Sequence, residues 1–137
     1  MPDPRFEPAT PFTDQDINDI QKHLGRELPE DYRRFVKEFG GAFIGGEIEG
    51  PKRTSILGLF EADEYKGPSS LIMTYADLCR AGSFPFADCE FGNPYILNAA
   101  DEVYYIDYTN GNSSPFKVAG SFRDFISHIV IEEESEG

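Results

Sequence analysis

Residues 24–41 read LGRELPEDYRRFVKEFGG, and this stretch governs how the first half of the chain folds. Pro29 suits the first position of a helix, because proline has no N–H to donate there. Apolar side chains then recur at the i, i+3, i+4, i+7 spacing of a helix with one buried face; they are Tyr32, Phe35, Val36 and Phe39. The stretch therefore predicts a helix that opens at Leu28-Pro29 and ends at Gly40-Gly41.

A second helix is predicted just before this stretch. Thr13 can cap it, and Gly25 can end it. Its apolar positions Ile17, Ile20 and Leu24 fall on one side. Because only a few residues join the two helices, we expect a helical hairpin whose apolar sides share one partner surface.

The rest of the chain alternates between strand and helix patterns. Residues 56–60 form the best strand candidate of the glycine-rich stretch 43–60. Thr74 and Asp77 resemble a capping box, which predicts a short helix that ends at Gly82. Ser121 can cap a last helix that runs through Val130. Strands are predicted, as an antiparallel meander, at residues 95–98, 103–107 and 116–119.

These elements predict a single α+β domain, in which helices cover one face of a mostly antiparallel sheet. The length of 137 residues suits one domain. Residues 1–12 carry four prolines and are expected to form an extended arm. Residues 13–131 would form the domain, and residues 132–137 an acidic tail.

The charge of the chain limits its partners. Twelve Lys and Arg stand against 25 Asp and Glu, a formal net charge of −13, which argues against nucleic acid or an anionic membrane as the partner. We find neither a signal peptide nor an apolar run of about 20 residues, so the expected location is cytoplasmic. Cys79 and Cys89 are then expected to be reduced thiols.

The sequence offers little for catalysis by a metal, cofactor or nucleophile. His23 and His128 lie far apart in the chain, and the two cysteines match no zinc-ligand spacing. No serine lies in a nucleophile elbow, and the paired glycines are not followed by the lysine of a phosphate-binding loop. We therefore expect no metal site, no cofactor and no catalytic nucleophile.

Acidic side chains are the remaining candidates for function. Neighbouring carboxylates could act as an acid and base pair, but in a chain this acidic they are more simply a solvated face that attracts a basic protein. The candidate partner-binding carboxylates are Glu61, Asp63, Glu64, Asp88, Glu90, Asp101 and Glu102.

Tyrosines near these carboxylates are candidate anchors for a protein partner, because tyrosine is frequent at binding hot spots. The candidates are Tyr65, Tyr104, Tyr105 and Tyr108. In a strand, Tyr105 would share one face with Val103, whereas Tyr104 and Tyr108 would share the other. Only one of the two sets can be exposed, and the alternation does not say which.

Several motifs together resemble the SUKH superfamily, over about residues 14–130. The N-terminal ones are Leu24-Gly25, Leu28-Pro29, Asp31-Tyr32, Phe35 and Gly40-Gly41. The later ones are Gly58, Phe84-Pro85-Phe86, Gly92-Asn93, Val103-Tyr104 with Asp107, and Ser121-Phe122 with Phe125. Pro94 departs from the pattern, and it limits that site to an edge strand or to the first residue of a strand.

The resemblance implies a noncatalytic protein-binding domain. Bacterial members of the superfamily resemble immunity proteins that neutralise a toxin, often a nuclease, and fungal members resemble regulators of glucan synthesis in the cell wall. A chain with a charge of −13 suits the first role, because carboxylates can occupy a basic surface made for phosphates. A regulatory or scaffolding module is the alternative, and a small carboxylate acid-base enzyme is the third hypothesis.

Overall fold

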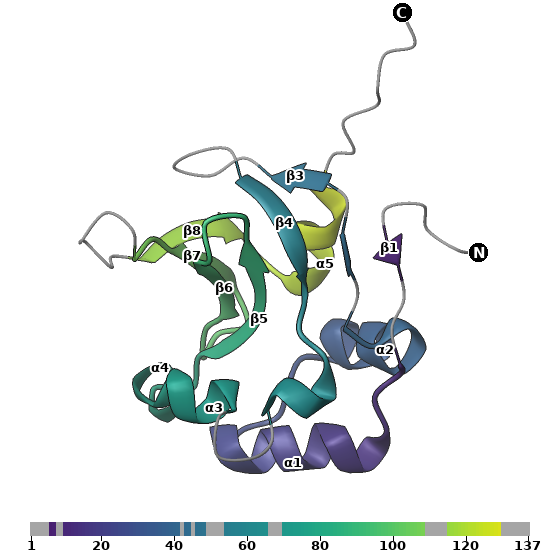
Figure 1. Ribbon diagram of the computed structural model, residues 1–137. Helices are drawn as coiled ribbons and strands as arrows, with labels where there is room; N and C mark the ends of the chain where they lie inside the picture. The colour runs from purple at the N-terminus through teal and green to yellow at the C-terminus, as the bar shows by residue number, and fades with distance from the viewer. Residues whose placement is uncertain are drawn as a thin grey trace, which may run out of the picture.

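The computed structural model describes residues 6–7, 10–41, 43–44, 46–48, 54–65, 70–108 and 115–129 (Figure 1). Helices α1 (Asp14–Leu24) and α2 (Glu30–Phe39) confirm the predicted pair. Thr13 caps α1 in a capping box, because its hydroxyl accepts from the Asp16 N–H and its own N–H donates to the Asp16 carboxylate. Pro29 precedes the first helical residue, so its expected position was wrong by one residue; its backbone is extended, with ψ at 152°.

The two glycines after α2 are each required, for different physical reasons. Gly40 has a φ of 69°, a left-handed value that side chains disfavour. Gly41 packs so closely on the backbone of Phe60 that a Cβ atom would overlap the Phe60 carbonyl. The pair therefore ends the helix and brings the chain against the segment that follows β4.

Six of the described strands form one antiparallel sheet in the order β3-β4-β5-β6-β7-β8. The sheet confirms the predicted meander, and Pro94 is the first residue of β6, a central strand. A separate pair joins β1 (Phe6–Glu7) to β2 (Phe43–Ile44). The six strands are β3 (Gly46–Ile48), β4 (Thr54–Leu59), β5 (Phe84–Cys89), β6 (Pro94–Leu97), β7 (Val103–Ile106) and β8 (Pro115–Ala119).

Strand β5 was not predicted, and the structure shows why. The register of β5 against its neighbour shifts between Pro85 and Ala87, and the strand is buried along almost its whole length. A bulged strand that is buried on both faces has no apolar and polar alternation to detect.

Two predicted helices differ from the structure. The segment around Thr74 forms α3 (Leu71–Thr74) and α4 (Ala76–Arg80), with the 3-10 helix η1 (Ala62–Tyr65) before them. Ser70 caps α3, and the Thr74 hydroxyl donates back to the Ser70 carbonyl, so the predicted cap at Thr74 is wrong. Helix α5 (Phe122–Ser127) starts at the Ser121 cap, as predicted. It ends before the predicted Val130, which lies outside the described residues, as does the acidic tail.

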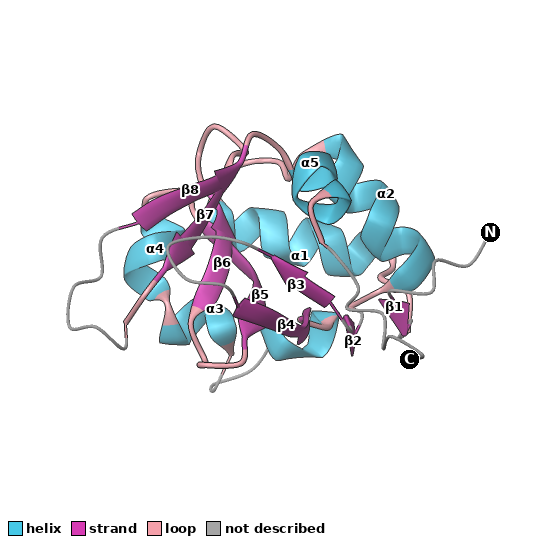
Figure 2. Cartoon of the chain, turned by 90° about the horizontal axis from the view of Figure 1, so that it is seen from above, coloured by secondary structure: helices cyan, strands magenta, loops and turns pink. Residues whose placement is uncertain are grey.

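The helices lie on both sides of the sheet (Figure 2). Helices α1, α2 and α5 share one side, whereas the short α3 and α4 lie towards the other. The core on the first side is aromatic: the Tyr32 ring meets Phe84 at 5.3 Å and Phe122 at 5.0 Å between centroids. Phe12 is also buried, and its N–H donates to the Val36 carbonyl, so packing begins before residue 13. Within the described residues, no helix is long and apolar enough to span a membrane.

Candidate functional site

Three candidate carboxylates are neighbours in the chain, and the charge of one of them, Glu64, reaches a fourth, Asp88. Glu61, Asp63 and Glu64 belong to η1 or the residue before it, where the Glu64 carboxylate accepts the Glu61 N–H at 3.3 Å. Asp88 lies in β5, close enough for Glu64 to perturb its titration. Among the described residues, no Lys or Arg forms an ion pair with any of these four. Within that part of the chain, no ion pair compensates their negative charge.

Asp88 has the most unusual environment of the four. It is partly buried, and burial raises the pKa of its carboxyl to about 6. The charge of Glu64 adds to this rise, and a hydrogen bond with the backbone of Asp88 opposes it. The ionised form of Asp88 is thus poorly stabilised by its own chain, and a cation placed beside it would be favoured.

Asp101 and Glu102 behave differently. They lie in the β6–β7 turn, and each already has a cation of this chain: Arg26 contacts Asp101 at 2.6 Å, and Lys117 contacts Glu102 at 3.0 Å. The hydrogen bond from Lys117, followed by one from Asn98, lowers the pKa of Glu102. These two carboxylates stabilise the turn. The turn is at one end of β6, whereas Pro94, the register partner of Asp88, is at the other end, so the two carboxylates lie away from Asp88. Glu90 is exposed in the turn after β5.

Arg26, which sequence reasoning missed, links three parts of the chain. Its guanidinium donates to the carbonyls of Gly82 at 2.7 Å and Asn98 at 2.8 Å, and also to the Asp101 carboxylate. Its side chain is 18% exposed. A single arginine has no local pattern, so nothing in the sequence distinguishes this residue from a surface cation.

The candidate tyrosines divide between core and surface. Tyr65 is only 2% exposed, and its hydroxyl donates to the Pro85 carbonyl at 2.7 Å, so the expectation that it anchors a partner is wrong. Tyr105 is buried as well, whereas Tyr104 is partly buried and Tyr108 is 45% exposed. The alternation thus places the exposed set on the sheet face away from α2 and α5.

Tyr108 stacks on a residue that sequence reasoning did not single out. Its ring lies 6.3 Å from that of Tyr75, with 22° between the planes. Tyr75 lies between α3 and α4; burial raises the pKa of its phenol, and Tyr108 and then the Asp88 carboxylate raise it further. Met73, two residues earlier, is 59% exposed. We call the group Glu61, Asp63, Glu64, Tyr75, Asp88 and Tyr108 the acidic-aromatic surface.

A buried polar network holds Tyr108 in place. The side chain of Asn93, which is 1% exposed, donates to the Tyr105 hydroxyl at 2.9 Å and to the Asp107 carboxylate at 3.1 Å. Its carbonyl oxygen accepts the Tyr108 N–H at 2.9 Å. Asn93 thereby ties the β5–β6 turn to the end of β7, which explains a Gly-Asn motif in structural terms.

Neither cysteine suggests surface chemistry. Cys79 and Cys89 are both free and buried, and burial raises the pKa of the Cys79 thiol to about 11. Within the described ranges, no three His, Cys, Asp or Glu side chains are grouped to hold a metal ion.

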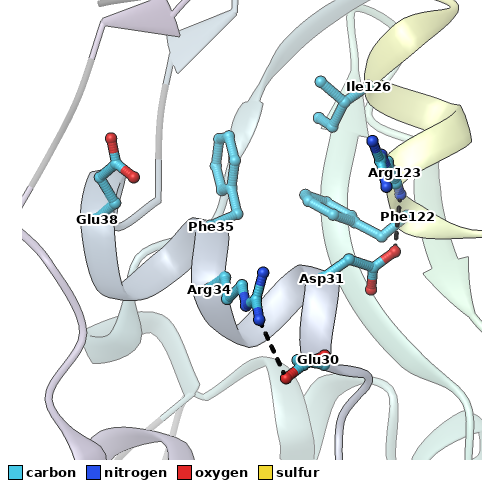
Figure 3. Close-up of a pocket in the computed structure, with 8 residues that line it drawn as sticks. All are labelled: Glu30, Asp31, Arg34, Phe35, Glu38, Phe122, Arg123 and Ile126. Atoms are coloured by element: carbon cyan, nitrogen blue, oxygen red, sulfur yellow. Dashed lines mark hydrogen bonds and ion pairs between the residues drawn. The ribbon is translucent and has the colours of Figure 1, made fainter. Parts of the chain in front are cut away.

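A groove of about 460 Å³ lies on the other side of the sheet, between α2 and α5 (Figure 3). Phe35, Phe122 and Ile126 give it an apolar lining, and Arg34 pairs with Glu30 along its rim. Its charges are mixed in sign, and the Asp31 carboxylate is engaged by the Arg123 N–H at 2.9 Å. The groove therefore shows no preference for one chemistry of ligand.

Comparison with known proteins agrees with this architecture. A family model described as the SMI1 / KNR4 family (SUKH-1) matches residues 11–128. The chain is also similar to the SPbeta prophage-derived uncharacterized protein YokK of Bacillus subtilis (strain 168), at 22% identity over 145 residues, which covers 88% of this chain and 76% of that protein. The match begins at Pro11, just before the buried Phe12, and ends just after α5, so the helical hairpin, the meander and the last helix all lie within it: the chain belongs to the SMI1 / KNR4 (SUKH-1) family.

Proposed function

We propose that this protein is a noncatalytic immunity protein that binds a basic toxin domain and neutralises it. The observation that carries the proposal is the acidic-aromatic surface: four carboxylates without a cation among the described residues, beside an exposed tyrosine. A net charge of −13 and the family of the chain support the same conclusion.

The mechanism follows from charge and shape. A toxin that acts on nucleic acid exposes lysine and arginine for phosphate groups. Carboxylates on this chain would take the place of those phosphates, while Tyr108 and Tyr75 supply aromatic contact area at the centre. Long-range attraction between opposite charges would also raise the rate of association. The toxin would thus be blocked without any bond being made or broken.

Two alternatives follow from the same residues. A regulatory or scaffolding module, such as the family suggests, would bind a partner without inhibiting it. A small acid-base enzyme could use Asp88 beside Glu64, because a carboxyl with a pKa of about 6 can exchange protons near neutral pH. Only the first function predicts loss of a partner's activity in proportion to the amount of this protein bound.

The test starts with capture of the tagged protein in its native lysate, followed by washes at low and high salt and mass spectrometry. The captured basic domain is then purified and its toxic activity measured against increasing amounts of this protein. We expect complete inhibition at one equivalent, and a strong loss of inhibition when Asp63, Glu64 and Asp88 are changed to Asn, Gln and Asn.

A matched control is needed, because any loss of negative charge weakens attraction. Glu30, Glu38 and Asp124 lie on α2 and α5, across the sheet, and their change to Gln, Gln and Asn alters the net charge equally. Binding without inhibition would favour the scaffold, and turnover of a substrate that depends on Asp88 would favour the enzyme. Equal effects of the two triple variants would contradict a role for the acidic-aromatic surface.

A further inference from the structure

Asp88 and the stacked tyrosines form a more specific feature within the acidic-aromatic surface. Tyr108 is held by Asn93 through its backbone, and its exposed ring stacks on Tyr75. Asp88 lies at the end of β5 opposite Pro94, and the Asn93 that precedes Pro94 holds Tyr108. The two tyrosine rings therefore stack on each other within electrostatic range of Asp88, which the charge of Glu64 on η1 also reaches.

The chemistry of these groups selects a cation. A carboxylate withdrawn from water is stabilised most by an opposite charge at close range. Aromatic faces attract cations as well, and the flat face of a tyrosine suits a flat cation. Arginine satisfies both, because its planar guanidinium can stack on a ring while its N–H groups donate to carboxylates; the compact, strongly hydrated ammonium of lysine cannot stack in this way.

Resting on the proposed function, we propose that one arginine of the protein partner inserts here, with its guanidinium stacked on the exposed ring of Tyr108, which Tyr75 supports from its other face, and its N–H groups donating to Asp88 and Glu64. This arginine anchors the partner, and the remaining carboxylates, Glu61 and Asp63, form an acidic rim. The site distinguishes a protein that displays a protruding arginine from one that is merely basic.

Binding at this site is linked to protons. Among the residues that the structure describes, the groups near Asp88 are Glu64 from η1 and Tyr75 from the α3–α4 junction. Tyr75 in turn contacts Tyr108, which Asp77 of α4 faces, and Asp77 is itself paired with Arg80. Since no cation in the described part of the chain pairs with Asp88, its carboxyl holds its proton up to about pH 6. A bound guanidinium favours the carboxylate, so its arrival expels that proton to the solvent, and affinity falls as the pH drops below about 6.

The test uses the full chain and three short probes, so that it does not depend on the toxin. Acetyl-Gly-Arg-Gly-amide is titrated into isotope-labelled protein, and the carboxyl carbon of Asp88 and the ring signals of Tyr75 and Tyr108 are followed by NMR. The same peptide with lysine or with neutral citrulline in place of arginine is titrated in parallel. We expect saturable shifts with arginine, roughly tenfold weaker binding with lysine and none with citrulline.

Variants separate this site from general attraction. Asp88→Asn and Tyr108→Ala are each expected to weaken binding of the arginine peptide roughly tenfold. Glu38→Gln on α2 changes the net charge by the same amount as Asp88→Asn, and it should leave the affinity for the peptide unaltered. Tyr108 is exposed, so its truncation should not unfold the chain, and a retained amide spectrum checks this. The Asp88 pKa should fall on binding.

Shifts spread evenly over all exposed carboxylates, or equal binding of the lysine peptide, would overturn the arginine site. The proposed function has its own test. If the Tyr108→Ala variant still inhibits the toxin fully, the immunity role stands and this anchor is rejected. Conversely, a saturable arginine site without any inhibited partner would keep the anchor and reject the immunity role.

Discussion

Gly41 shows how a single atom decides local packing. A Cβ at this position would overlap the Phe60 carbonyl, whereas a Cβ at Gly25 would meet no atom within 4 Å. We expect Gly41→Ala to lower the free energy of unfolding by about 2 kcal/mol or more, because backbone must move to make room. Gly25→Ala should cost about 1 kcal/mol, from its left-handed φ alone. Urea unfolding of both variants measures the difference, and a larger loss at Gly25 would contradict the clash.

Arg26 makes structural contacts that the sequence does not indicate. Its guanidinium donates to three carbonyls outside the α1–α2 linker and to Asp101. Arg26→Lys keeps the charge but loses the fork of donors, so we expect a loss of about 2 kcal/mol in thermal or urea unfolding. Asparagine at position 101 tolerates the φ of 63°, so Asp101→Asn removes only the ion pair. We expect it to lower the free energy of unfolding by about 1 kcal/mol or less. Equal losses would mean that charge, and not the carbonyl contacts, dominates.

At the scale of elements, Asp31 joins two helices that are far apart in the chain. One of its carboxylate oxygens accepts the Tyr32 N–H in α2, and the other accepts the Arg123 N–H at the start of α5. Because α5 is short, its first turn depends on such acceptors as well as on the Ser121 cap. The helix is thus positioned by α2 as much as by its own sequence.

Removing this acceptor should be measurable. We expect Asp31→Ala to lower the free energy of unfolding by about 1–2 kcal/mol, since the Arg123 N–H loses its partner. The neighbouring Glu30→Ala is a suitable control, because Glu30 and Arg34 form an exposed pair at 3.4 Å that is worth less than about 0.5 kcal/mol. Chemical denaturation of the two variants compares them. A similar loss in both would assign the effect to charge at the N-terminus of α2.

At the scale of the whole molecule, Asp88 makes stability depend on pH in an unusual direction. Its pKa is about 6 in the folded chain and 3.8 when unperturbed, so between these values the folded state binds more protons than the unfolded state. The free energy of unfolding therefore falls as the pH rises through this range, which is opposite to the usual effect of a carboxylate.

Asp88→Asn should remove this penalty. Because the side chain is only partly buried, we expect a gain of about 1 kcal/mol in the free energy of unfolding near pH 7.5, and no gain below about pH 3.5. Urea unfolding of the parent and variant across this pH range gives both values. A loss of stability at neutral pH would show that the carboxylate is already compensated within the chain. A gain in stability together with weaker binding would mark Asp88 as a binding residue.

Net charge is the second property of the whole molecule. With −13 on 137 residues, the folded chain repels itself, and salt screens that repulsion. We expect the Tm to rise by several degrees between about 0.01 and 0.3 M NaCl, and to rise less in the variant with Asp63, Glu64 and Asp88 neutralised. Differential scanning calorimetry tests both statements. An unchanged Tm would indicate that the ion pairs offset the repulsion.

Local physics explains what the sequence could predict. The helical hairpin, the Ser121 cap, the strands after Pro94 and the α+β class all follow from spacing, caps and turns, which act within a few residues. Strand β5 could not be predicted, because burial on both faces removes the alternation. The cap at Ser70 was missed because Thr74, four residues later, is also a capping residue type and is followed by Asp77.

The sequence by itself determined the family, the order of most elements and an acidic character that favours a basic partner. Only the tertiary structure decided which acidic residues remain without a cation: Asp101 and Glu102 have Arg26 and Lys117, distant in sequence, whereas Asp88 and Glu64 have none among the described residues. It likewise buried Tyr65 and exposed Tyr108 beside Tyr75. The physical reason is that ion pairing and burial depend on contacts across the sheet, which no pattern of neighbouring residues contains.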